Sequence, residues 1–411
     1  MTSQNRRLTM KDNQAKYPQL RFKGFTDPWE RRKLANVVSI SAGGDVDKTK
    51  LIENGGYPVL ANALTNSGIV GYYDSYKVEA PAVTVTGRGD VGHAVARHVN
   101  FTPVVRLLSL KSEVLDADFL ANMLNQTNIL VESTGVPQLT APQLGSYKIL
   151  YPNLNEQTKI GKLLNAFDNL IALHQRKLAK LKELKQGYLQ KLFPKNGSKF
   201  PQLRFSGFAD AWEERKLGNE LTLLKDGTHG THQDVIEGPF LLSAKNIKNG
   251  KIIIDEITDR KISVGEYNSI HKRFSLEKGD VLLTIVGSIG ETAIIENPIG
   301  ITFQRSVAYL RPSHTILSQF LFTTINGQKF QMELRKRQVV SAQPGIYLGD
   351  LSIIPILIPS VAEQAKIGSF FEQLDKTIAL HQRKLEKLQE LKKGYLPVSY
   401  THLTLPTTER V

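Results

Sequence analysis

The sequence predicts an α+β protein in which two similar globules are joined by two long helices that form an antiparallel intramolecular coiled coil. A block beginning at Pro18 reads PQLRFKGFTDPWERRKLAN, and it returns at Pro201 as PQLRFSGFADAWEERKLGN. A longer block beginning at Glu156 reads EQTKIGKLLNAFDNLIALHQRKLAKLKELKQGYL, and it returns at Glu363 as EQAKIGSFFEQLDKTIALHQRKLEKLQELKKGYL. The segments between these blocks differ between the halves and carry short β-type runs. Constant blocks around divergent inserts indicate one frame that holds two different globules.

The repeats divide the chain into six segments. We expect a flexible N-terminal segment at 1–17, a first globule at 18–152 and a first helix at 153–195. A second globule at 196–360 and a second helix at 361–396 follow. Pro397 is expected to end this helix, since proline disrupts a helix interior. The Thr-rich tail 397–411 has no counterpart in the first copy, which favours a frameshift or foreign sequence over a divergent natural tail.

Each globule is predicted to mix strands with helices. Strand-like runs lie at 82–86 and 104–110 in the first globule, and at 280–286 and 306–310 in the second. Helical stretches are expected at 116–124 and 317–337. The fragments TGRGDVG from Thr86 and TIVGSIG from Thr284 each follow a strand. We expect both to be hairpin turns whose glycines need a positive φ, so the two globules should share one fold.

The repeated helix carries apolar residues at steps of four and three, which is the pattern of a coiled coil. Such a stripe requires a partner helix, and the other copy is the natural one. A helix of this length spans roughly 50–60 Å, so an antiparallel pair predicts a rod with a globule at each end. The predicted seam consists of Ile171, His174, Leu178, Leu181, Ile378, His381, Leu385 and Leu388.

Polar residues also occupy this stripe. Lys185 and Lys392 hold equivalent positions, as do the two seam histidines. Polar seam residues can fix the register of a coiled coil. A register pin or a subunit contact is one interpretation, and the polar edge of a wide stripe is the other.

Composition bounds the class of protein. The 411 residues carry a net charge of +14 with a pI near 9.6, which suits a polyanion partner, nucleic acid first and an acidic membrane surface second. The chain has no cysteine, which excludes disulfides and thiolate metal sites and fits a reducing cytoplasm. No apolar run is long enough to span a bilayer, and the N-terminus lacks the apolar region of a secretory signal.

Two motifs resemble chemical sites but favour simpler interpretations. Residues 87–92 match GxGxxG, yet a strand-like run follows where a dinucleotide site needs a helix. His229, His232 and Asp234 lie in a loop that has no counterpart in the first half, so a polar loop is favoured over a metal site. Methyltransferase, phosphate-loop and paired-carboxylate nuclease motifs are missing from the sequence. We therefore expect no catalysis, no metal and no cofactor bound by this chain.

The repeated blocks resemble those of the specificity subunit of type I restriction–modification systems, over residues 18–396. This resemblance implies two target-recognition domains that read the halves of a split, asymmetric DNA site. It implies double-stranded DNA, two methyltransferase subunits and motor–nuclease subunits as partners, with S-adenosylmethionine, ATP and Mg bound by those subunits. The alternatives are a coiled-coil DNA-binding scaffold outside a restriction system and, through GxGxxG, a standalone nucleotide-binding enzyme.

Side chains that read DNA are expected on loops above the strands. Arg88, beside the glycine turn, and the pair Gln304 and Arg305, after a turn, are the favoured ones, although any of them could be a solvated loop residue. The predicted candidates are Asn62, Thr86, Arg88, Asp90, His93, Lys225, His229, Lys245, Asn246, Ser288, Gln304 and Arg305, with Asn66 and Thr228 beside them.

Overall fold

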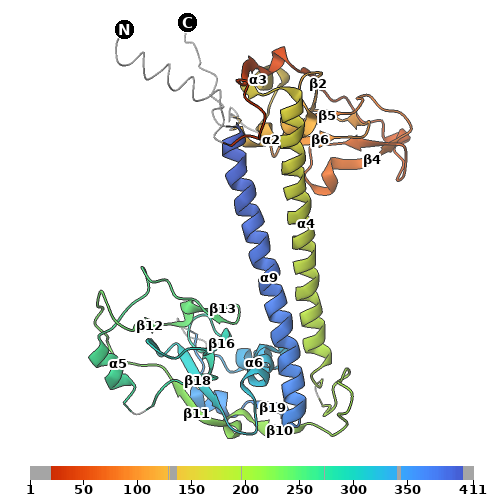
Figure 1. Cartoon of the computed structure of the whole chain (residues 1–411). Coiled ribbons are helices and arrows are strands. Elements are labelled where there is room, and N and C mark those ends of the chain that lie inside the picture. Colours follow the sequence, from red (N-terminus) through yellow and green to blue (C-terminus); the bar gives the residue numbers. More distant parts are fainter. Residues whose placement is uncertain are drawn as a thin grey trace, which may run out of the picture. The chain divides into compact units, whose positions relative to one another are not determined.

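The chain forms two compact units, which share both long helices (Figure 1). The computed structural model describes residues 20–127, 129, 137–195, 197–272, 274–339 and 344–400, the last four by backbone alone. The first unit covers residues 1–176 and 383–411, and the second covers 177–382. The predicted flexible segment 1–17 and most of the predicted tail lie outside the described residues.

The first unit contains a globule of short strands and helices. Its strands are β1 (Glu30–Lys33), β2 (Ser39–Ala42), β3 (Tyr57–Leu60), β4 (Ile69–Tyr73), β5 (Ala82–Thr86), β6 (Ala94–Arg97), β7 (Thr102–Pro103), β8 (Leu107–Lys111) and β9 (Lys148–Tyr151). Its helices are α2 (Ala117–Gln126) and α3 (Ala141–Gly145), with 3-10 turns η1 (Leu34–Asn36), η2 (Lys48–Lys50) and η3 (Thr65–Gly68).

The main sheet of this unit has the order β2-β8-β5-β6, and all its neighbours are antiparallel. Because side chains alternate along a strand, Val83 and Val85 share one face, and Phe119 of α2 lies in the same buried cluster. Figure 1 shows α2 beside β5 and β6. Asp116 caps α2, its carboxylate accepting a hydrogen bond from the Phe119 amide at 3.0 Å. The opposite face carries the polar side chains of Thr84, Ser109 and Arg97 beside apolar Leu107, and we call it the polar face. Leu107 packs there with Leu60 of the smaller sheet β4-β3-β7.

The second unit repeats this plan. Its strands are β10 (Glu213–Lys216), β11 (Leu221–Asp226), β12 (Phe240–Leu242), β13 (Ile247–Lys248), β14 (Lys251–Ile252), β15 (Val281–Thr284), β16 (Thr292–Ile294), β17 (Ile301–Phe303), β18 (Val307–Pro312) and β19 (Pro355–Ile358). Its helices are α5 (Val264–Ile270), α6 (Ser318–Asn326), α7 (Gln328–Lys336) and α8 (Leu348–Ser352), with 3-10 turns η4 (Leu217–Glu220) and η5 (Ala244–Asn246). The main sheet order is β11-β18-β15-β16, so the prediction of one fold for both globules is confirmed.

The repeated block before each globule closes that globule onto the following long helix. In the first unit, the Arg21 guanidinium pairs with both carboxylate oxygens of Glu156, each at 2.8 Å. In the second unit, Arg204 pairs with Glu363 in the same way, again at 2.8 Å twice. Both glutamates are buried. Equivalent pairs from both blocks explain why these residues stay constant while the inserts diverge.

The long helices α4 (Leu154–Lys191) and α9 (Val361–Tyr400) pack against each other within each unit (Figure 1). In the second unit, Lys185 forms an ion pair with Asp375 at 2.6 Å. In the first unit, their counterparts Lys392 and Asp168 pair at 2.5 Å. Later residues of α4 therefore meet earlier residues of α9, and the predicted antiparallel pairing is confirmed. The two lysines act as register contacts between the helices.

Three predicted element boundaries were wrong. The run 104–110 is broken because Arg106 takes a φ of 68° in a turn, so only Leu107 onward is a strand. The helix expected at 317–337 is two helices, because Gly327 is extended, with ψ at 147°. Helix α9 continues through Pro397 to Tyr400. Proline removes one hydrogen bond to the preceding turn, and its ring crowds the carbonyl four residues earlier. Only three helical residues follow Pro397, so this cost is confined to the last turn.

Candidate nucleic-acid interface

The loops at one end of each main sheet carry half of the predicted DNA-contacting residues. In the first unit, Thr86 at the end of β5 lies opposite Leu107 at the start of β8. The hairpin 87–93 and the loop 104–106 therefore emerge at the same end of the sheet. In the second unit, Thr284 lies opposite Val307, so loops 285–291 and 304–306 share an end as well. We call these segments the strand-end loops.

The predicted glycine hairpin is confirmed in both units. Gly89 and Gly92 have φ values of 78° and 89°, which only glycine adopts without strain. The Thr86 hydroxyl donates to the Asp90 carbonyl and accepts from the His93 amide at 2.9 Å. Thr284 makes equivalent bonds in the second unit, accepting from the Glu291 amide at 2.9 Å. Because Thr86 is buried and its hydroxyl both donates and accepts within the hairpin, its side chain shapes the hairpin.

Asn62 joins the strand-end loops of the first unit to each other. Its amide nitrogen donates to the Val105 carbonyl at 2.9 Å, and its oxygen accepts from the Gly87 amide at 2.8 Å. These bonds hold both loops from the β3–β4 connection. Asn66 donates to the Ile69 carbonyl at 3.2 Å in the same connection. Both asparagine amides therefore hold backbone groups, Asn62 from a half-buried place and Asn66 from an exposed one.

Arg88 and Asp90 are exposed at the tip of the hairpin, as a surface that contacts DNA requires. The Arg88 side chain makes no hydrogen bond or ion pair with any other described residue. Arg106 lies on the neighbouring loop and donates to the Gln138 side chain at 3.0 Å, while Arg88 forms a β-bridge with Gln138. Sequence reasoning missed Arg106 because it stood inside a strand-like run. Its basic type was the only available signal.

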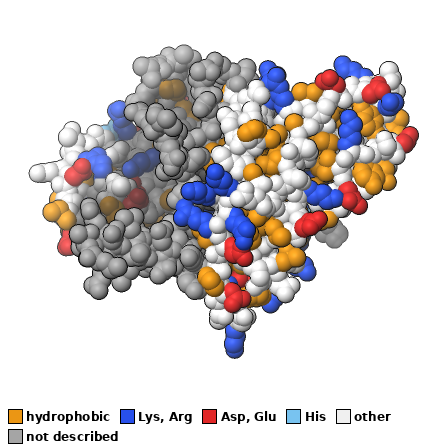
Figure 2. Space-filling model, turned by 90° about the horizontal axis from the view of Figure 1, so that it is seen from above, with side chains coloured by type: hydrophobic (Ala, Val, Ile, Leu, Met, Phe, Trp, Pro, Cys, Tyr) orange, Lys and Arg blue, Asp and Glu red, His pale blue; other side chains and the backbone are white. Residues whose placement is uncertain are grey.

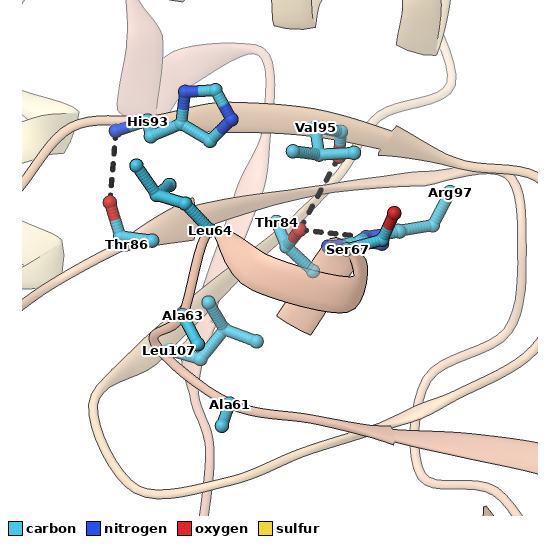
Figure 3. A pocket seen from close by; sticks show the side chains of 10 residues that line it. All are labelled: Ala61, Ala63, Leu64, Ser67, Thr84, Thr86, His93, Val95, Arg97 and Leu107. Carbon is cyan, nitrogen blue, oxygen red and sulfur yellow. Dashed lines mark hydrogen bonds between the residues drawn. The ribbon is translucent and has the colours of Figure 1, made fainter. Parts of the chain in front are cut away.

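His93 is exposed after the hairpin, and its side chain lies at the edge of a cavity on the polar face of the sheet (Figure 3). Its backbone amide holds the hairpin through Thr86, while no described residue bonds the imidazole. The hairpin therefore presents one guanidinium, one carboxylate and one imidazole on its outer surface. This set of donors and acceptors fits a polar or anionic partner.

The second unit exposes a different set on the same frame. Arg305 is exposed, and its backbone amide donates to the Thr228 carbonyl at 3.0 Å. Ser288 is exposed on the hairpin, and Gln304 is half-buried next to Arg305. Gly227 permits this approach, because a Cβ there would lie 2.2 Å from the Phe303 carbonyl oxygen. The three predicted residues of loops 285–291 and 304–306 thus lie at one end of the sheet.

The remaining candidates of this unit have internal partners. Lys225 is exposed on β11, with its ammonium 4.9 Å from the centre of the Phe274 ring. Lys245 pairs with Asp259 at 2.8 Å. Asn246 is buried and donates to Asp259 at 2.7 Å, so its side chain does not reach a ligand in this conformation.

Asp259 is held as a carboxylate within this network. Burial tends to raise its pKa, but hydrogen bonds from Lys245 and the Asp255 amide outweigh this, so the net pKa lies below the ordinary value. Lys245 and Asn246 belong to turn η5, so the network holds this turn in place. The Ala244 amide of the same turn donates to the Ser306 hydroxyl at 3.0 Å, which places the turn beside the strand-end loops.

The two loop histidines bind separate partners. His229 contacts Asp226 at 2.5 Å, and His232 contacts Glu266 at 2.6 Å. The second nitrogen of His232 lies 2.9 Å from the Thr228 hydroxyl. Asp234 pairs with Arg260 at 2.6 Å. Among the described residues, no group of three or more His, Cys, Asp or Glu side chains could hold a metal ion.

The GxGxxG fragment of the first unit is followed by strand β6, as expected, and lacks the helix that a dinucleotide site needs.

No helix in the described part of the chain is long and apolar enough to cross a membrane. On the face shown in Figure 2, Lys and Arg side chains form several separate groups among hydrophobic and acidic ones. Groups of this kind suit contacts with phosphates along a nucleic acid.

The predicted seam residues lie on the inner side of the long helices. Leu178 and Leu385 are buried, at 7% exposure each, although their neighbours on both sides are exposed. The other predicted seam residues are half-buried, namely Ile171, His174, Leu181, Ile378, His381 and Leu388. Alternation of covered and exposed positions at these steps is typical of paired helices.

Comparisons with known proteins identify relatives along most of the chain. A family model described as the type I restriction modification DNA specificity domain matches residues 26–183 and again residues 212–390. The type I restriction enzyme MjaVIII specificity subunit of Methanocaldococcus jannaschii is 27% identical over 309 residues, which are 72% of this chain and 72% of that protein. The putative MjaX specificity subunit of the same organism is 23% identical over 417 residues, covering 91% of this chain and 93% of that protein.

A solved structure has the same fold. The crystal structure of a type I restriction-modification system S subunit from M. genitalium superimposes with a TM-score of 0.65 at 17% identity. The match covers 94% of this chain and all of that one. The likeness therefore extends over both globules and both long helices.

Proposed function

The chain belongs to the type I restriction–modification DNA specificity family, and from this premise we propose that it is the non-catalytic subunit that recognises a bipartite, asymmetric DNA site. The observation that carries the proposal is the pair of strand-end loops, which have one backbone design and different exposed side chains. One unit offers Arg88, Asp90 and His93, and the other offers Ser288, Gln304 and Arg305. Two matched frames with unlike surfaces suit two unlike half-sites.

Direct recognition requires side chains that reach base edges from a rigid support. Arg88 and Arg305 are exposed arginines on loops fixed by backbone bonds, and arginine binds the O6 and N7 atoms of guanine in a bidentate way. The buried Thr86 and the half-buried Asn62 hold the loops in place through hydrogen bonds to their backbone. Other exposed lysines and arginines supply phosphate contacts, which position the protein without selecting a sequence.

The constant blocks are proposed to dock two methyltransferase subunits, to which motor–nuclease subunits are added. S-adenosylmethionine, ATP and Mg are assigned to those partner subunits, because no catalytic motif occurs in this chain. The two copies of the long helix present related outer faces, and two copies of one subunit can therefore bind them equivalently. The cytoplasm, where DNA is accessible, is the proposed location.

Selection from random duplexes tests this function. The chain is assembled with its partner subunits, incubated with duplexes of random sequence at fixed salt, and the bound duplexes are sequenced. We expect two short specified half-sites separated by an unspecified spacer. One contiguous motif, or no enrichment at all, would contradict a bipartite site.

Loop variants then assign the half-sites. Arg88→Ala should relax one half-site and leave the other unchanged, and Arg305→Ala should do the reverse. A lost bidentate base contact costs about 1–3 kcal/mol of discrimination, which is roughly a 5- to 150-fold change in preference. The two variants serve as controls for each other, because each removes one positive charge. If either relaxes both half-sites equally, the assignment of one unit to one half-site is wrong.

The paired helices are proposed to set the spacer length. Deleting 178–184 together with its counterpart 385–391 removes one heptad from each helix and preserves the seam. Each helix shortens by about 10 Å, and DNA rises 3.4 Å per base pair, so the spacer should shorten by roughly three base pairs. Changed half-sites with an unchanged spacer would show that the helices do not set it.

A further inference from the structure

The polar face of the first unit's main sheet contains a cavity of about 110 Å³ below the connection between β3 and β4 (Figure 3). A volume of roughly 10–15 Å³ is enough for one water molecule, so the cavity can hold a small polyatomic group. Its lining on the side of the sheet and hairpin consists of Thr84, Thr86, His93, Val95, Arg97 and Leu107. The β3–β4 connection contributes Ala61, Ala63, Leu64 and Ser67. No carboxylate lines it, which argues against a metal cation as its occupant.

In the second unit, buried apolar side chains occupy the corresponding place. Strand pairing matches Thr84 with Leu282 and Ser109 with Tyr309, since each couple occupies the same step of its sheet. Both residues of the second unit are completely buried in an apolar cluster. The same fold is therefore stable with this layer apolar, and the polar layer of the first unit is a feature of that unit alone.

Arg97 is the charged residue of the cavity. Its Nε donates to the Thr84 hydroxyl at 2.9 Å, and its two terminal nitrogens have no bonded partner among the described residues. It forms no ion pair with any acid in the described ranges. Burial lowers the pKa of this guanidinium, which still remains charged. The corresponding residue in the second unit is Ile295, which is fully buried.

A second polar group near the cavity also has no partner. Ser109 lies directly opposite Thr84 on β8, and its hydroxyl is buried without a hydrogen bond in the structure. Its side chain lines a second, more open hollow on the same face of the sheet, next to Lys111. Buried polar groups are normally bonded, so the unbonded Ser109 hydroxyl indicates that this face of the sheet can accept a further polar group.

We propose that this cavity binds an oxyanion through the terminal nitrogens of Arg97, with the imidazole of His93 at its edge, and that in the DNA complex the oxyanion is a backbone phosphate. An arginine fork matches phosphate geometry. The cavity lies next to the hairpin that carries Arg88, so a strand held there has its adjacent bases near the strand-end loops. The DNA part of this inference rests on the proposed function, whereas the oxyanion site does not.

Arg97→Ile tests the site, because the second unit already places isoleucine at this position in the same fold. The full chain is titrated with inorganic phosphate while the Nε–Hε resonance of Arg97, assigned by its loss in the variant, is followed by NMR. We expect a saturable shift in the wild type. Circular dichroism melting shows whether the variant folds, and Arg97→Lys provides a variant that keeps the charge without the fork.

DNA binding forms the second arm. The dependence of duplex affinity on salt is measured for the wild type, Arg97→Ile and Arg32→Met, which removes an equal charge from exposed strand β1. Loss of one phosphate contact should reduce the salt slope by about 0.9 in Arg97→Ile, and the control should keep the wild-type slope. A phosphate shift with an unchanged DNA slope would mean that the site holds a free anion and would overturn the DNA assignment.

Absence of any phosphate shift together with an unchanged slope would overturn the whole proposal. If the wild-type chain binds no duplex at all, the proposed function fails, and the phosphate titration still decides whether the oxyanion site exists. The two proposals therefore fail in distinguishable ways.

Discussion

Replacing Arg204 by methionine should destabilise the second unit far more than loss of an ordinary surface ion pair would. Arg204 binds Glu363 through two bonds of 2.8 Å, and their side chains are only 15% and 2% exposed. The variant leaves the Glu363 carboxylate buried without its counter-charge. Breaking a buried pair from one side costs about 3–5 kcal/mol.

Glu363 lies in the first turn of α9, where the helix dipole stabilises a negative charge. This favourable position offsets about 0.3–1 kcal/mol, which leaves an expected loss of about 2–4 kcal/mol. Changing Glu363 to glutamine in the same background removes the buried charge and should recover much of that loss. Arg21→Met provides the matched experiment, because Arg21 and Glu156 make the same pair in the first unit.

Native-state hydrogen exchange measured by mass spectrometry suits this test, because it reports the opening free energy of each unit separately. Arg204→Met should lower protection at the start of α9 and in β19, which precedes it. Arg21→Met should instead lower protection at the start of α4. A loss below about 1 kcal/mol, as for exposed pairs, or no recovery with Glu363→Gln, would refute the reasoning.

Three further predictions follow from the packing and the charges. Leu192→Ala should cost the second unit about 2–5 kcal/mol in thermal unfolding, because this leucine is 3% exposed within the apolar core. Exchanging Lys185 and Asp375 should leave helix pairing intact, whereas Lys185→Asp alone should lower the melting temperature, since it places two carboxylates together. Asp259→Asn should destabilise the protein at pH 7. The difference in unfolding free energy between the wild type and this variant should narrow below about pH 4. The sign follows from the lowered pKa of Asp259 in the folded state, whose stabilising effect is present above the unfolded pKa and is lost as the pH falls. Equal destabilisation at pH 7 and pH 3 would contradict this assignment.

The sequence repeats predicted the architecture because the repeated residues make the same structural contacts in both units. The two Arg–Glu pairs and the two Lys–Asp pairs each join residues of constant blocks. Apolar residues at alternating steps of three and four residues predict a paired helix from the sequence alone. The glycine hairpin was equally predictable, because the positive φ values that it requires belong mainly to glycine.

The predicted contact residues were less reliable, for physical reasons. Residue type placed Thr86 and Asn246 among the DNA candidates beside the favoured Arg88, yet the first two are buried and bonded internally, and Arg88 is exposed. Arg106 was missed because one left-handed residue turned a strand-like run into a loop. Sequence type gives the chemistry of a side chain, but not which atoms its own fold already uses.

The sequence by itself determined the two-fold plan: two globules of one fold, an antiparallel helix pair and a basic chain that lacks catalytic motifs. These features rest on local periodicity and internal repetition, which are written along the chain. Only the tertiary structure decided which face of the first unit's main sheet carries the polar side chains, which loops meet at one end, and that Arg97 lines a cavity where the second unit has an apolar core. Those properties depend on strand pairing between residues far apart in the sequence. The surroundings of a side chain therefore cannot be predicted until its partners across the sheet are known.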